Sequence, residues 1–210
     1  MVIHLLMVDI LSTSLLRFRQ FWGSSTYYGA QTTNTVIKLG EWNHVVLLYN
    51  EDSDNNDATM YVNGESVDIS EVDDPDGGTV SSEADRDLLI GNDTSGERSF
   101  EGCITELSYW NDSFTQSEVN ELYNNGKALD ATTHSASSNL KGYWRNNGLA
   151  IWQDLTSYNN DGTPANITET MLITAGVDSS RDSQGFLMNR QRTTNSLNLT
   201  TRATELDETV

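Results

Sequence analysis

Residues 42–67 read WNHVVLLYNEDSDNNDATMYVNGESV, and this stretch decides the fold class. The run 42–49 is short, apolar and rich in branched residues, which predicts a buried strand. A second apolar run, 58–62, predicts the return strand. The Asn63-Gly64 pair that follows predicts a tight hairpin, because a type I′ turn requires positive φ at both central residues. The stretch therefore predicts antiparallel β-structure.

The rest of the chain has the same β-type pattern of short apolar runs separated by turn residues, and the whole chain contains 15 glycines. Further strands are expected at residues 36–39, 65–69, 87–90, 100–109, 140–144 and 171–174. A long acidic loop is expected over 70–85. The apolar run 1–16 has no cationic region before it and is interrupted by His4 and Asp9, so it predicts buried strands rather than a signal peptide.

One helix is clearly signalled. The segment 115–118 reads TQSE and fits a capping box, in which the Thr115 hydroxyl and the Glu118 carboxylate each bind a free backbone N–H. Apolar residues at 119, 122 and 123 share one helical face. Gly126 suits the position just after the helix.

Composition limits the partners. The 210 residues include 31 acidic and 12 basic side chains, a net charge of −19, and a single cysteine. Residues 51–130 hold 21 acids against three bases, a net of −18. Such a chain is repelled by nucleic acid and by anionic membranes, and no apolar stretch reaches the ~18 residues of a membrane span. We interpret the acidic block as solvated loops, with a cation site as the alternative.

Several motifs occur in a characteristic order. They are LGEWNHVV at 39–46, MYVNGE at 60–65, LIG at 89–91, FEGCITEL at 100–107, and the helix with SEV at 117–119 and LY at 122–123. Together they resemble the second half of a LamG-like domain of the concanavalin A-like lectin/glucanase superfamily. The resemblance implies an all-β, antiparallel jelly-roll sandwich with one short helix. We interpret Trp42 as a large apolar anchor between its sheets.

The motif order departs from the family at one point. A block of the form G-x-W and D-x-S-G-x-x-N-x-G-T normally opens such domains, whereas here GYW at 142–144 and DLTSYNNDGT at 154–163 come late. We therefore expect a LamG-like sandwich over residues 1–130. As an alternative, this sandwich is incomplete at its N-terminus. Residues 131–175 either complete it or open a second copy. Residues 176–210 form an irregular arm, of which 176–198 resembles C-terminal regions of virion structural proteins of tailed phages.

The family resemblance also implies a cofactor. LamG-like relatives hold Ca²⁺ on loops at the sandwich edge, and this hard cation prefers oxygen ligands. The matching residues here are Asp154, Asn159 and Asp161, which we take as candidate Ca²⁺ ligands. The alternative is that these residues form Asx turns, in which Asn and Asp bond to their own backbone.

Four aromatic residues fall in turns or at strand ends, where their rings could stack on a sugar. They are Tyr27, Tyr28, Trp110 and Tyr158. The alternative is that they are half-buried residues at the sandwich edge.

Motifs for catalysis are missing: there is no nucleophile elbow, Walker loop, dinucleotide fingerprint or zinc spacing. We therefore predict a protein that is not an enzyme. The leading hypothesis is a virion structural or attachment domain of a tailed phage that binds cell-surface glycans. Its partners would be glycans or other virion proteins, and it could be an oligomer. The alternative is a secreted or cell-surface carbohydrate-binding module, detached from a glycoside hydrolase and located outside the cell.

Overall fold

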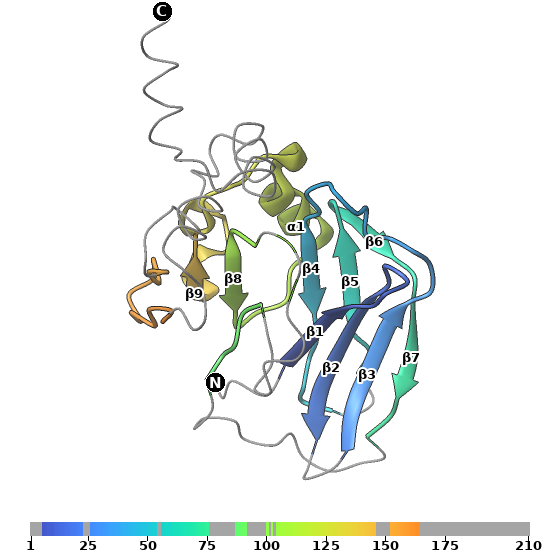
Figure 1. The fold of residues 1–210 in the computed structure, drawn as a ribbon. Coiled ribbons are helices and arrows are strands. Elements are labelled where there is room, and N and C mark those ends of the chain that lie inside the picture. The colour runs from blue at the N-terminus through green and yellow to red at the C-terminus, as the bar shows by residue number, and fades with distance from the viewer. Residues whose placement is uncertain are drawn as a thin grey trace, which may run out of the picture. The chain divides into compact units, whose positions relative to one another are not determined.

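The computed structural model describes residues 6–22, 26–53, 56–75, 87–91, 100, 102, 104–145 and 152–163. The chain divides into two compact units, one of residues 1–100 with 111–126 and the other of residues 101–110 with 127–210. The described residues form mostly antiparallel strands and one short α-helix (Figure 1). This confirms the predicted fold class.

The first unit holds a four-stranded antiparallel sheet in the order β1-β2-β3-β7. Its strands are β1 (Leu6–Ile10), β2 (Leu16–Trp22), β3 (Thr26–Thr32) and β7 (Ile69–Asp73). Along β2 every second residue is buried, which is the period of a strand with one face on a core.

The second sheet of this unit contains β4 (Val45–Leu48), β5 (Thr59–Val62) and β6 (Glu65–Val67). Its hairpin confirms the sequence prediction. Asn63 and Gly64 have φ of 54° and 84°, and the flanking residues of β5 and β6 pair directly. The Asn63 side chain also accepts a hydrogen bond from the His44 backbone N–H, at 2.9 Å, which ties the turn to the start of β4.

One apolar cluster joins the two sheets, as expected for a sandwich. Its buried members are Leu16, Phe18, Trp22, Tyr28, Ala30, Ile37, Ala58, Met60 and Val62. The predicted anchor Trp42 is not among them, because its side chain is 40% exposed, and Trp22 is the buried tryptophan of this cluster. The interpretation of Trp42 was therefore wrong.

The helix α1 (Gln116–Tyr123) begins at the predicted capping box. The Thr115 N–H donates to Glu118 Oε2 at 2.7 Å, and the Glu118 N–H donates to Thr115 Oγ1 at 3.4 Å. The helix ends at Asn124, which has φ of 46°, rather than at the predicted Gly126. A short η1 turn (Asn124–Gly126) follows.

Other predicted elements differ from the structure. Residues 36–39 and 87–90 are not strands, and the expected loop over 70–85 begins with strand β7. The strand predicted over 100–109 is the shorter β8 (Leu107–Trp110). The predictions for 171–174 and for the arm 176–210 lie outside the described residues.

The second unit is built on the antiparallel pair β8 and β9 (Leu140–Trp144), with short turns η2 (Ala131–Thr133) and η3 (Ser137–Asn139). Single bridges join Trp144 to Asp154 and Trp152 to Gly162. A small core of Ala131, Leu140 and Tyr143 packs with Trp110. In the part of the chain that the structure describes, no helix has the length and apolar character of a membrane span.

Candidate functional site

The loop 154–161 of the second unit is organised around the buried carboxylate of Asp154. Oδ1 accepts hydrogen bonds from the backbone N–H of Tyr143 and Thr156, each at 3.0 Å, and from the Thr156 hydroxyl at 2.8 Å. Oδ2 accepts one from the Asn160 N–H at 2.9 Å. Four donors thus converge on one side chain and hold the loop against β9.

The charge state of Asp154 follows from these contacts. Burial raises the pKa of the Asp154 carboxyl, but the hydrogen bonds from Asn160, Thr156 and Tyr143 outweigh burial and hold its pKa below the ordinary value. The neighbouring Asp161 accepts the Asp154 N–H at 2.9 Å. Asn159 adopts φ of 54° and donates its amide to the Ser157 carbonyl at 3.0 Å.

The three predicted calcium ligands therefore lie in one loop, but their contacts are those of Asx-turn chemistry. Oδ1 of Asp154 accepts three hydrogen bonds and Oδ2 accepts one, whereas a cation binds oxygen lone pairs that no donor occupies. No group of three or more His, Cys, Asp or Glu residues suited to a metal occurs in the described ranges. These contacts favour the Asx-turn alternative for Asp154, and calcium binding by the chain stays a prediction.

The same loop presents an exposed aromatic ring beside a cation. Tyr158 is 53% exposed. Lys141 Nζ on β9 donates to the Tyr158 hydroxyl at 2.9 Å and lies 5.3 Å from the ring centroid. The Tyr158 backbone N–H also donates to Thr156 Oγ1 at 3.3 Å. Tyr158 is thus held from two sides while half of its side-chain surface stays open to solvent.

The other predicted stacking residues are less available. Tyr28 is 1% exposed, stacks on Tyr49 at a centroid distance of 4.7 Å, and accepts the Ala58 N–H at 2.9 Å. It is a core residue with no exposed ring face, so the prediction for Tyr28 was wrong. Tyr27 is half-buried, with its ring 5.7 Å from that of Phe21.

Trp110 is also half-buried. It meets His134 edge to face at 5.2 Å and donates Nε1–H to the Ser108 hydroxyl at 2.9 Å. Its packing against the small core of the second unit favours a structural role.

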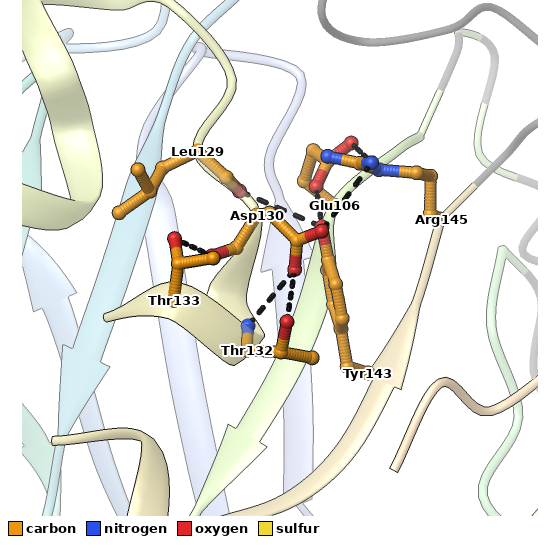
Figure 2. Close-up of polar contacts among 7 residues, drawn as sticks. All are labelled: Glu106, Leu129, Asp130, Thr132, Thr133, Tyr143 and Arg145. Carbon is orange, nitrogen blue, oxygen red and sulfur yellow. Dashed lines mark hydrogen bonds and ion pairs between the residues drawn. The ribbon is translucent and has the colours of Figure 1, made fainter. Parts of the chain in front are cut away.

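A second polar cluster joins the start of β8 to the end of β9 (Figure 2). Glu106 is held by two groups: the Tyr143 hydroxyl donates to Oε2, and Arg145 Nε donates to Oε1 at 2.9 Å. Arg145 Nη1 also lies 3.8 Å from Asp130 Oδ2. Asp130 in turn caps η2 by accepting the Thr132 N–H at 3.0 Å.

The electrostatics of this cluster are dominated by burial. Burial raises the pKa of the Glu106 carboxyl above its ordinary value, although the hydrogen bonds from Tyr143 and Arg145 oppose the shift. Burial and the neighbouring Glu106 raise the pKa of the Tyr143 hydroxyl. Glu106 has φ of 54°, an uncommon conformation for a residue with a side chain. Because its groups bind one another, we interpret the cluster as structural: its hydrogen bonds and ion pairs hold β8, β9 and η2 together.

Sequence reasoning missed Lys141, Glu106 and Arg145. The only signal for Lys141 was a lysine inside the predicted strand 140–144. No local pattern marks Glu106 as left-handed or pairs it with residues 37 and 39 positions later. These contacts arise from the pairing of β8 with β9.

Comparison with known proteins identifies the family. A laminin G family model, described as the concanavalin A-like lectin/glucanases superfamily, matches residues 6–120, more than half of the chain. No curated protein and no solved structure matches significantly. The match covers β1 to β8 and most of α1, and the antiparallel sheets agree with it. The chain belongs to the concanavalin A-like lectin/glucanase superfamily.

Proposed function

We propose that this chain is a non-enzymatic carbohydrate-recognition domain whose sugar contact is the exposed ring of Tyr158. Superfamily membership suggests carbohydrate binding or a structural role. The observation that favours binding is the open ring of Tyr158 on a loop that four hydrogen bonds to Asp154 hold in place. An aromatic face held rigidly on the surface loses little conformational freedom when a flat ligand stacks on it.

The absence of catalysis is part of the proposal. Glycoside hydrolysis requires two carboxyl groups on either side of the scissile bond, one of which donates a proton. In the described second unit, burial raises the pKa of the Glu106 carboxyl, but both of its oxygens are bound by Tyr143 and Arg145. We expect no release of reducing sugar from any glycan that binds.

The setting we propose is the surface of a tailed-phage virion, where the domain would attach the particle to host glycans. This part rests on the resemblance of residues 176–198 to virion proteins, and these residues lie outside the described ones. A carbohydrate-binding module acting outside the cell is the competing setting. Immunogold labelling of particles with an antibody to this chain separates the two.

The test is binding of the purified full-length protein to a glycan array, with Ca²⁺ and again with excess chelator. Tyr158→Ala removes the proposed contact. Trp42→Ala is the matched control, because Trp42 is an exposed aromatic of the first unit, 40% exposed against 53% for Tyr158.

We expect binding to be lost in Tyr158→Ala, kept in Trp42→Ala, and unchanged by chelation. Binding by neither protein nor variant would refute carbohydrate recognition and leave a structural role. Binding that survives Tyr158→Ala would refute the assignment to this loop.

A further inference from the structure

We infer that the Tyr158 surface selects anionic sugars, with Lys141 binding a carboxylate or sulfate on the ring that stacks on Tyr158. This inference rests on the function proposed above and adds the class of ligand.

The first argument is the state of the Lys141 ammonium. It has three N–H donors, and one is used by the Tyr158 hydroxyl at 2.9 Å. Within the described residues no carboxylate pairs with Lys141. The buried carboxylate of this loop, Asp154, already receives four hydrogen bonds from other groups. Among the described residues, two of the Lys141 donors therefore have no partner, and they lie beside an exposed ring.

The second argument is contrast with the rest of the chain. None of the described lysines, Lys38, Lys127 and Lys141, has a carboxylate partner among the described residues, and of the three Lys141 is the one bonded to an exposed aromatic residue. Arg145, by comparison, is bound to Glu106 at 2.9 Å and lies 3.8 Å from Asp130. With no carboxylate partner among the described residues, Lys141 is suited to bind an anion from outside.

The third argument is geometry. Lys141 Nζ lies 5.3 Å from the Tyr158 centroid and touches the hydroxyl, so the ammonium is at the hydroxyl end of the ring. A pyranose stacked on the ring would bring an equatorial or exocyclic acid group toward that end. A neutral sugar could use the ring but would gain nothing from the charge.

The negative charge of the whole chain does not exclude an anionic ligand. At 0.15 M salt, exposed charges are screened beyond about 8 Å, so distant carboxylates act weakly. A direct contact with Lys141 is screened much less. The inference therefore concerns short oligosaccharides with one acid group at the contact rather than long polyanions, whose further charges would meet the acidic surface.

The experiment uses the full chain at 0.15 M NaCl and an array of oligosaccharides in matched sets. Each set contains a uronate-, sialate- or sulfate-bearing glycan and its neutral counterpart, made by carboxyl reduction, desialylation or desulfation. We expect acidic members to bind about tenfold more tightly than their neutral counterparts. Lys141→Met should weaken that binding about tenfold, and Lys141→Arg should retain it. Lys127→Met is the control, because it changes the net charge equally at an exposed lysine.

The outcomes separate the inference from the function on which it rests. Equal binding of acidic and neutral members, or no effect of Lys141→Met beyond that of Lys127→Met, would overturn the anionic preference and leave sugar binding intact. No binding to any glycan would overturn both. Binding confined to carboxylate sets or to sulfate sets identifies which anion the ammonium accepts.

Discussion

The substitution Asp154→Asn tests whether the 154–161 loop is held by hydrogen bonds or by a cation. Asparagine keeps the shape of the side chain but replaces one oxygen with an NH₂ group. If the NH₂ takes the place of Oδ2, it faces the Asn160 N–H, which then has no acceptor. The other three donors keep an oxygen but lose its negative charge.

The magnitude follows from these contacts. A hydrogen bond to a charged group contributes roughly 1.5–3 kcal/mol against about 0.5–1.5 kcal/mol for a neutral one, so three bonds lose about 1 kcal/mol each. A buried N–H without a partner costs about 1–3 kcal/mol more. Partial relaxation of the loop reduces the sum, and we expect the loop to lose about 3–5 kcal/mol of local stability.

The assay is amide hydrogen exchange, which reports local opening. The Asn160 and Tyr143 amides should exchange at least a hundredfold faster in Asp154→Asn than in the wild type. Asp161→Asn is the graded control, because its Oδ1 accepts a single N–H, and it should have a smaller effect. Wild-type exchange should be the same in Ca²⁺ and in chelator. Protection that rises with Ca²⁺ in the wild type but not in Asp154→Asn would refute the reasoning and restore the calcium site.

Four other changes have defined outcomes. Burial lowers the pKa of His44 to about 4, so the unfolded chain binds more protons below pH 6.5, and stability falls as the pH drops. Urea unfolding should show the wild type losing about 2 kcal/mol more than His44→Phe between pH 7.5 and 5. Gly64→Ala should lower the free energy of unfolding by about 2–3 kcal/mol in thermal unfolding, because its Cβ would lie 2.7 Å from Tyr123 Cδ1 and its φ is positive. Gly40→Ala is the control: its φ is 78° but the space around it is open, so it should cost about 1 kcal/mol. Tyr143→Phe leaves Glu106 Oε2 without its donor and should lower the free energy of unfolding by about 1–3 kcal/mol, measured by thermal unfolding. An unchanged midpoint of thermal unfolding would contradict the structural role of the Glu106 cluster. A chain ended after residue 130 loses β9, the partner of β8. It should show a weaker β-type circular dichroism signal and more aggregation than a chain ended after residue 175. Equal signal and equal aggregation of the two chains would favour residues 131–175 as the start of a second copy.

Local chemistry explains which elements could be predicted. The Asn63-Gly64 hairpin and the Thr115–Glu118 capping box depend on groups within a few residues of one another, and both occur as predicted. The prediction of a strand over 36–39 was wrong for a related reason. The apolar composition of this segment reflects burial of Ile37 in the core from a loop, and burial alone does not distinguish a loop from a strand.

The candidate site was predicted only in part. The sequence located the polar loop with Asp154 and the aromatic Tyr158, because both belong to a compact motif. It could not reveal that the donors for Asp154 include the Tyr143 N–H, 11 residues away, or that Lys141 lies beside Tyr158. Exposure was equally hidden: Tyr27 and Tyr28 are neighbours, yet Tyr28 is in the core.

The sequence by itself determined the β-class, the hairpin, the capped helix and the family, because turn residues, caps and strand patterns act over short distances and recur in a characteristic order. Only the tertiary structure decided which tryptophans are buried, which tyrosine faces solvent, and which donors meet the carboxylate of Asp154. Those outcomes depend on the pairing of β8 with β9 and on the packing of two sheets, which bring together side chains far apart in the chain.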